Sequence, residues 1–332
     1  MLRLSIIIPC LETDGRLDDT LASVLQNRPE ACEVIVVHRG RYDDPYELAS
    51  EVVFHQSADD ESLVDLLNRG LALAQAPIVH LLACGGEVED GWTDRAVRRF
   101  DDERVAAVAP LLTTGRFDDG AADAQPVQTG IVRGRFERSR PLRQTPNQVE
   151  SAGTRPLGPS LAAGFYRAQS LRDVGGFEPS VGADLADLDV ALRFAALGLR
   201  CVVETTSRVT HADGGRTADS AFAAGQAAER VFWRHVFSRH GGGVAAALLH
   251  PLAIAADCLV QLPRGGALRR LAGRLSVLTE AAALARRGMN RTPASPQPIV
   301  APKGPATGTS RRIDLSHNRE RRSGRGAEKF VQ

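Results

Sequence analysis

Short apolar runs rich in β-branched residues alternate with amphipathic segments through the first hundred residues, and this alternation limits the possible folds more than any other feature. The runs occupy residues 4–9, 33–38, 52–55 and the stretch after Pro77. Between the first two runs, apolar residues recur at helical spacing, at Leu17, Leu21, Val24 and Leu25. Continuous apolar runs are typical of strands that are buried on both faces of a sheet. The alternation therefore predicts a parallel, doubly wound α/β sheet with right-handed crossovers.

The run after Pro77 reads Ile-Val-His-Leu-Leu-Ala-Cys-Gly-Gly and ends where a sheet of this kind binds its ligands. In open α/β sheets, ligands bind beyond the carboxyl ends of the strands. Ala83, Cys84 and Gly85 occupy that place, and none of them carries a carboxylate. The functional interpretation of the chain depends on this absence.

The middle of the chain has a weaker pattern. Residues 105–112 predict a further strand, whereas residues 113–159 show no clear period and predict a long loop, which in a compact domain is usually functional or mobile. Residues 183–197 predict a helix, and residues 200–204 predict a strand. The stretch from Val209 onward, which contains His211, is expected to be a loop.

The last hundred residues predict helices followed by a polar tail. Residues 227–240 predict a helix that combines aromatic and basic side chains: Phe232, Trp233, Phe237, Arg230, Arg234 and Arg239. Residues 244–262 are long enough to span a membrane, but Pro251 and Asp257 interrupt them, and a second basic helix is expected at about 267–287. We therefore expect a main domain at 1–220, a helical appendage at 221–288 and a disordered basic tail at 289–332.

Composition excludes several classes of protein. With 43% apolar and 24% charged residues the chain resembles a globular protein, and a net charge of +1 gives no indication of nucleic-acid binding. Its five cysteines are widely scattered, which suits a reducing compartment rather than a disulfide framework or a structural metal site. The N-terminus reads as a strand and lacks the features of a signal peptide.

Several short motifs appear in a fixed order over residues 1 to about 215. The first strand ends in Pro9 and is followed by Glu12, and Asn68-Arg69-Gly70 lies in a helix. The remaining motifs are Glu87-Val88-Glu89-Asp90-Gly91-Trp92, Val174-Gly175-Gly176-Phe177, Asp187-Leu188-Asp189, Leu192-Arg193 and His211. Together they resemble family 2 glycosyltransferases, which have the Rossmann-like GT-A fold of nucleotide-diphospho-sugar transferases.

This resemblance implies a chemistry for which the chain lacks some of the groups. Members of the family hold the nucleotide diphosphate through a divalent cation bound to Asp-x-Asp, and hard cations of this kind prefer oxygen ligands. By position, that motif falls on Ala83-Cys84-Gly85. The uracil-recognising Asp of the family falls within His38-Arg39-Gly40, and its Glu-Asp pair becomes Ala186-Asp187. No metal ligand and no cofactor are therefore assigned.

The resemblance also assigns candidate site residues. Asp187 is the candidate catalytic base, because the family uses a carboxylate there to deprotonate the acceptor hydroxyl. The donor-binding candidates are Pro9, Glu12, Arg39, Asn68, Gly70, Ala83 and Gly85. The acceptor-side candidates are Gly164 and Asp189.

Each candidate has a structural alternative. Asp187 and Asp189 could be solvated helix charges, and Asn68 and Gly70 could merely let a helix approach the sheet. For several other residues, a structural role is favoured over a functional one. Arg39 and Arg41 could contact a phosphate in place of a cation, Cys84 could be a nucleophile or a small residue that fills space, and His211 could be a metal ligand or a loop histidine. Glu87 and Glu89 could donate an oxygen to a cation or mark the exposed side of an extended segment.

The resulting hypothesis is a transfer of a sugar from a nucleotide-sugar donor to a glycan or lipid-linked acceptor, in surface polysaccharide or glycolipid assembly. The rival hypothesis is an inactive pseudo-glycosyltransferase that binds a glycan or a partner protein. A third possibility is a transferase that uses Arg39 or Arg41 instead of a metal. The aromatic and basic helices suggest a cytoplasmic protein lying on the inner face of the membrane, with packing on the main domain as the alternative.

Overall fold

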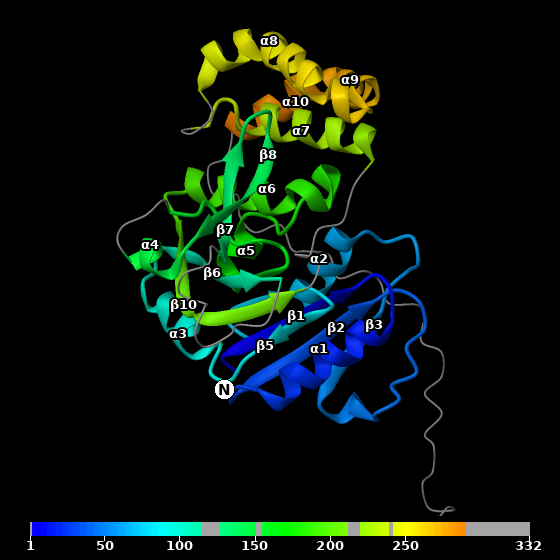
Figure 1. Cartoon of the computed structure of the whole chain (residues 1–332), viewed down its shortest axis with the longest axis vertical. Coiled ribbons are helices and arrows are strands. Elements are labelled where there is room, and N and C mark those ends of the chain that lie inside the picture. Colours follow the sequence, from blue (N-terminus) through cyan, green and yellow to red (C-terminus); the bar gives the residue numbers. More distant parts are fainter. Residues whose placement is uncertain (1, 115–126, 151–154, 212–219, 239–241, 290–332) are drawn as a thin grey trace, which may run out of the picture. The chain divides into compact units, whose positions relative to one another are not determined.

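The computed structural model describes residues 2–114, 127–150, 155–211, 220–238 and 242–289, which form a ten-stranded sheet with helices packed against it (Figure 1). The N-terminal half of the sheet is parallel, as predicted, in the order β3-β2-β1-β4. Its strands are β1 (Leu4–Cys10), β2 (Cys32–His38), β3 (Val52–Gln56) and β4 (Ile78–Leu82). The connections contain α1 (Gly15–Gln26), the 3₁₀ turn η1 (Leu48–Ser50) and α2 (Leu63–Leu73).

The other half of the sheet is mixed, so the prediction of a parallel sheet throughout is wrong. Strand β9 (Ala163–Arg167) lies antiparallel between β4 and β6 (Val105–Thr113). Strand β10 (Arg200–His211) is parallel to β6 and antiparallel to the short β5 (Gly86–Val88). An apolar run indicates burial and carries no information about strand direction, which explains the error.

Residues 113–159, predicted as a loop, contain a hairpin of β7 (Val127–Gly134) and β8 (Arg138–Gln144), followed by α4 (Pro146–Glu150). The hairpin extends from the carboxyl end of β6, where Leu112 pairs with Gln128. Most residues of β8 are not buried, and its sequence Arg-Ser-Arg-Pro-Leu-Arg-Gln lacks apolar alternation. Strand β10 also continues to His211 where a loop was predicted, because a register shift between Glu204 and Arg208 interrupts its pattern.

Both faces of the sheet are buried, which explains the continuous apolar runs. In β1, Ile7 belongs to one core cluster, whereas Ile6 and Ile8 belong to the other. Helix α2 approaches β1 closely, because a Cβ added at Gly70 would lie 2.3 Å from Ile7 Cγ2. The other helical segments of the main domain are α3 (Asp94–Arg98), η2 (Arg99–Asp101), α5 (Ala168–Asp173), η3 (Pro179–Val181) and α6 (Gly182–Ala196).

The C-terminal helices are α7 (Ala221–His235), α8 (Gly243–Gln261), η4 (Leu262–Arg264), α9 (Ala267–Ser276) and α10 (Leu278–Met289). The predicted basic helix at 267–287 is thus two helices, which meet at Val277. Helix α7 contacts α6, α9 and α10 (Figure 1), and the described residues up to Met289 belong to one compact unit. The predicted tail, apart from Met289, lies outside the described residues.

Candidate functional site

The carboxyl ends of β1, β4 and β10 converge at the edge predicted to bind the donor. Hydrogen bonds hold the segment Ala83-Cys84-Gly85 there. Ala83 N–H donates to the Ala162 carbonyl at 2.8 Å, and Gly85 N–H donates to Thr20 Oγ1 at 2.8 Å. His211 Nε2 lies 3.1 Å from the Cys84 carbonyl oxygen. We call this region the donor edge. His211 is buried at the end of β10, so its reading as a loop histidine is wrong in location.

The residues of the donor edge do not fit a divalent cation. Ala83 and Gly85 have no ligand atoms in their side chains, and a Cβ at Gly85 would lie 3.7 Å from both Arg16 Cδ and His211 Nε2. A guanidinium beside this position would repel a cation. Among the described residues, no cluster of three or more His, Cys, Asp or Glu side chains could hold a metal ion.

Glu87 and Glu89 are exposed on either side of the buried Val88. This pattern agrees with the reading of the two glutamates as the outer side of an extended segment.

The Arg39 side chain donates hydrogen bonds to backbone carbonyls of two neighbouring loops. Its Nε donates to the Leu11 carbonyl at 3.3 Å, and its Nη1 donates to the Asp59 and Glu61 carbonyls at 3.2 Å each. Arg41 is 85% exposed and pairs with Asp43. Arg39 therefore braces the loop after β2, and its predicted direct contact with a phosphate would require these bonds to break.

Sequence reasoning missed Arg16, whose side chain lies beside Gly85. Arg16 is half exposed, and its guanidinium pairs with Asp14 at 2.8 Å and with Glu12 at 3.7 Å. The hydrogen bond with Asp14 raises the pKa of Arg16. A cation in the first turn of α1 is unfavourable for the helix dipole, and that position is the signal by which the sequence could have revealed it.

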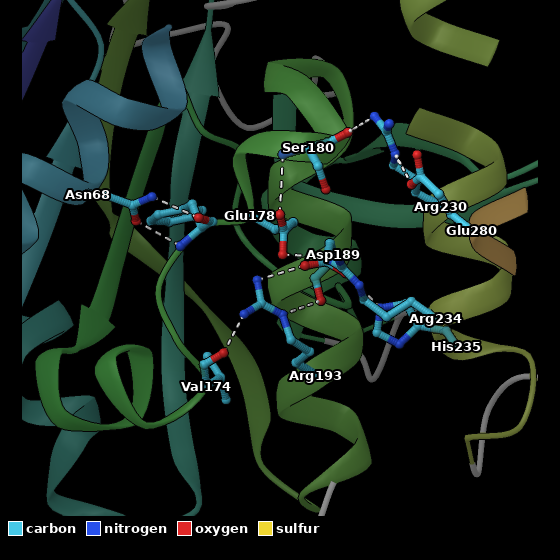
Figure 2. A network of polar contacts seen from close by, with 11 residues as sticks. Asn68, Val174, Glu178, Ser180, Asp189, Arg193, Arg230, Arg234, His235 and Glu280 are labelled. Atoms are coloured by element: carbon cyan, nitrogen blue, oxygen red, sulfur yellow. Dashed lines mark hydrogen bonds and ion pairs between the residues drawn. The ribbon is translucent and has the colours of Figure 1, made fainter. Parts of the chain in front are cut away.

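Asn68 and Gly70 both have structural roles. Asn68 Nδ2 donates to the Phe177 carbonyl at 2.7 Å, and Phe177 N–H donates to Asn68 Oδ1 at 2.9 Å (Figure 2). This pair ties α2 to the turn at Gly176, while Gly70 allows α2 to approach β1. The structural alternative for both residues is supported, and their predicted contact with the donor remains a prediction.

Asp187 lies on α6 and is 9% exposed, so it is not a solvated helix charge. One of its oxygens accepts a hydrogen bond from Leu188 N–H at 2.6 Å. The backbone around it is tightly packed: a Cβ at Gly158 would lie 2.7 Å from Ala191 Cβ, and one at Gly164 would lie 2.7 Å from Pro159. Gly164 pairs with Leu81 of β4. Gly158 therefore allows its segment to lie against α6, and Gly164 allows β9 to lie against Pro159.

Asp189 is fully buried in an ion-pair cluster, which we call the α6–α7 cluster (Figure 2). Its carboxylate lies 2.7 Å from Arg193 Nη2, 2.8 Å from His235 Nε2 and 3.4 Å from Arg234 Nη1. Burial alone would raise the pKa of Asp189, but Arg193, Arg234 and His235 hold it well below its usual range. Both predictions for Asp189 are corrected here: it is not solvated, and a carboxylate without exposed surface does not contact an acceptor.

Residues 5–162 match the family model described as Glycosyl transferase family 2. These residues are therefore similar to a glycosyltransferase family 2 domain. Its mixed sheet and helices have the GT-A fold, as the sequence predicted.

Solved structures share this fold at low sequence identity. The crystal structure of GalNAc-T7 with UDP, GalNAc and Mn2+ has a TM-score of 0.57 at 15% identity, over 77% of this chain and 51% of that one. The crystal structure of S. aureus TarS 1-349 in complex with UDP has a TM-score of 0.50 at 13% identity, over 86% of this chain and 89% of that one. This chain thus spans about half the length of the GalNAc-T7 chain. No curated protein matches it in sequence.

Helix α7 does not have the exposed aromatic and basic face that the sequence predicted. Phe232 is buried, and Arg234 is buried between Asp189 and Glu178, to which it pairs at 3.0 Å. Trp233 Nε1 donates to Glu229 at 2.8 Å, and Phe237 is partly exposed. Helix α7 is therefore a packing helix of the fold, as in the alternative considered for it, and its predicted position on a membrane surface remains a prediction.

Helix α8 places ionisable side chains toward the fold and apolar side chains toward the outside, the opposite of an ordinary surface helix. Its two ionisable residues face the fold: His250 bonds Glu229 at 2.8 Å, and Asp257 pairs with Arg138, Arg270 and Arg274 at 2.8–3.0 Å. Its exposed side chains are apolar and include Val244, Leu248, Leu249, Leu252, Leu259 and Val260. By length and composition alone α8 could cross a membrane, with a mean hydropathy of 1.8.

Proposed function

We propose that the family 2 domain transfers a sugar from a nucleotide-sugar donor to an acceptor hydroxyl without a divalent cation at the donor edge. The observation that carries the proposal is Asp187, which keeps a carboxylate on α6 at the family's base position while the cation position carries Ala83 and Gly85. In this reaction the Asp187 carboxylate takes the acceptor proton, and the acceptor oxygen attacks the anomeric carbon. The bond from that carbon to the diphosphate breaks, and the nucleotide diphosphate leaves.

Arg16 is the proposed partner of the diphosphate. The side chain lies beside Gly85, and a guanidinium binds phosphate oxygens through charge-assisted, often bidentate hydrogen bonds. Its present partners, Asp14 and Glu12, are partly exposed, and exposed ion pairs contribute only about 0–1 kcal/mol. A diphosphate could therefore replace them at small cost. Arg16 takes the role in the metal-free mechanism that the sequence suggested for Arg39 or Arg41.

The acceptor is proposed to be a glycan or a lipid-linked sugar at the cytoplasmic face of a membrane, and α8 is the observation that supports this location. The inner residues of α8 are bonded to β8, α7 and α9, so a transmembrane position would break the contacts of Asp257 and His250. An apolar outer face on a helix that is held to the fold suits a position parallel to the membrane surface.

A direct test is a product assay with UDP-, GDP-, CMP- and TDP-sugars and extracts of membrane glycolipids, with and without Mn²⁺. Turnover that persists in a chelator and is lost in Asp187→Asn supports the proposal. Turnover that depends on Mn²⁺ contradicts its metal-free part.

A pseudo-glycosyltransferase that binds a glycan or a partner is the second candidate. It is favoured by the carboxylates of Glu12 and Asp14, which partly neutralise Arg16 beside Gly85. Binding of a glycan with no binding of any nucleotide would support this candidate over the transferase.

A further inference from the structure

Two thiols lie in contact at the donor edge. Cys10, the last residue of β1, and Cys84, two residues beyond β4, have sulfur atoms 3.2 Å apart. Cys10 Sγ also lies 2.8 Å from the Glu12 carbonyl oxygen. Both cysteines are free thiols. The transferase mechanism proposed above uses neither of them.

The backbone geometry suits a bond between these sulfur atoms. Strands β1 and β4 are parallel neighbours, and Ile7 pairs with Leu81. Cys10 ends β1 and Cys84 lies in the turn that follows β4, and their side chains meet there with the sulfur atoms 3.2 Å apart. A disulfide has an S–S length of about 2.03–2.05 Å, compared with the 3.2 Å between these two sulfur atoms. The bond therefore requires only a short approach of two sulfur atoms that are already in contact.

The two thiols differ in exposure and acidity. Cys84 is partly exposed, and the hydrogen bond from Cys10 lowers the pKa of its thiol, with a smaller contribution from Arg16. Cys10 is buried, and its hydrogen bond to Cys84 together with burial raises the pKa of its thiol. Since the thiolate is the nucleophile, an oxidant should react first at Cys84, with Cys10 beside it.

We propose that Cys10 and Cys84 are a reversible redox pair, which hydrogen peroxide converts to an intramolecular disulfide at the donor edge. The Cys84 thiolate attacks one peroxide oxygen to give a sulfenic acid, and the other oxygen leaves as hydroxide and is protonated to water. The Cys10 sulfur then displaces the sulfenic hydroxyl, which leaves as a second water with the Cys10 proton. Two thiols and one peroxide thus give one disulfide and two waters, and a dithiol reductant reverses the oxidation.

Oxidation would change how the Ala83-Cys84-Gly85 segment is held. In the thiol form the segment is held by hydrogen bonds to Ala162, Thr20 and His211. In the disulfide form it is also joined covalently to β1, which closes a loop of 75 residues counted from Cys10 to Cys84. Loops of this length confer stability when they are cross-linked, so the oxidised protein should melt at a higher temperature. This consequence does not depend on any transferase activity.

The experiment treats the folded, full-length protein with increasing hydrogen peroxide, blocks the remaining thiols with iodoacetamide and analyses intact mass and peptides. We expect loss of the mass of two hydrogens, a linked peptide containing Cys10 and Cys84, and full recovery with dithiothreitol. Cys10→Ser should stop at a Cys84 sulfenic acid that dimedone traps, and Cys84→Ser should form no disulfide. Cys201→Ser, at a buried cysteine elsewhere in the core, is the matched control and should oxidise like the wild type.

Three results would overturn the proposal. The first is oxidation of Cys258 while Cys10 and Cys84 remain as thiols. The second is a disulfide between two chains, and the third is a Cys84 sulfenic acid that persists in the wild type although Cys10 is present.

Discussion

The donor edge and the α6–α7 cluster lie in the same domain but have opposite electrostatic character. At the donor edge, the positions to which the resemblance assigns the family's metal ligands carry Ala83 and Gly85, and hydrogen bonds from the backbone hold the segment in place. In the α6–α7 cluster, one fully buried carboxylate is surrounded by Arg193, Arg234 and His235. The charged side chains of the α6–α7 cluster therefore stabilise the fold, whereas the Ala83-Cys84-Gly85 segment of the donor edge has no charged side chain.

This difference separates two roles that look alike in sequence. Asp187 and Asp189 belong to one short motif, yet one keeps a small exposed surface and the other has none. Asp189 joins α6 to Arg234 and His235 of α7 and also pairs with Arg193 within α6, a role that does not require the domain to be an enzyme. A resemblance based on such residues supports the fold more strongly than the chemistry.

The largest effect is expected from breaking the α6–α7 cluster. Asp189→Asn leaves the buried Arg193 without its counter-charge and leaves Arg234 paired with Glu178 alone, which should lower the free energy of unfolding by about 3–5 kcal/mol. Urea denaturation measures this change, with the exposed Asp173→Asn on α5 as a control that should change it by less than about 0.5 kcal/mol. An Asp189→Asn protein as stable as the wild type would show that the cluster contributes little.

The same cluster predicts a pH dependence. The folded pKa of Asp189 is depressed below the unfolded value of about 3.9, so its stabilisation is fully present above that pH and is lost as pH falls toward the folded value. The free energy of unfolding of the wild type should therefore fall more than that of Asp189→Asn between neutral pH and about pH 3. The range ends there because about pH 3 lies below the unfolded pKa. Parallel loss in both proteins would contradict this assignment.

Asp187 should matter for turnover. If the domain is an active transferase, Asp187→Asn should reduce kcat by about 10²–10⁴, the usual contribution of a general base. Because Asp187 is nearly buried, the melting temperature must be measured alongside, and Asp173→Asn again serves as the control. Full turnover in a folded Asp187→Asn protein would place the base elsewhere.

At the donor edge, Arg16 and Arg39 should behave differently. Arg16→Gln should weaken nucleotide diphosphate binding about 10- to 150-fold, since a hydrogen bond to a charged group contributes about 1.5–3 kcal/mol. Arg39→Gln should mainly reduce stability, because it removes donors to three backbone carbonyls. Calorimetry together with thermal melts separates the two, and an unchanged affinity in Arg16→Gln would rule out its role.

The smallest effect concerns α8. The full-length protein should float with anionic liposomes and be released by alkaline carbonate, and Leu248→Gln or Leu252→Gln should each weaken binding about tenfold through lost apolar burial. Leu197→Gln, at an exposed position after α6, is the control and should have no effect. Failure of the wild type to bind liposomes would contradict the membrane position, and resistance to carbonate would indicate a spanning helix.

The sequence predicted the parallel half of the sheet, α1, α2 and α6, because buried strands and amphipathic helices leave periodic patterns. The GT-A fold was implied by the resemblance of its motifs to family 2 glycosyltransferases. It missed the β7–β8 hairpin, since a strand such as β8 that is mostly unburied leaves no apolar alternation. It could not foresee the side on which His250 and Asp257 of α8 face, because helical periodicity does not identify what lies beside a helix. The proximity of Arg16 to Gly85 and of Cys10 to Cys84 depends on the packing of separate elements, which no local pattern contains.

The central claim is that the donor edge binds a nucleotide diphosphate without a divalent cation. Isothermal titration calorimetry of the full-length protein with UDP, GDP and TDP, each in chelator and in Mn²⁺, tests it most directly. The account predicts saturable binding of at least one nucleotide diphosphate, with the same Kd in both conditions. Stoichiometric Mn²⁺ binding together with nucleotide affinity that appears only in its presence would contradict the claim, as would the absence of binding by any nucleotide.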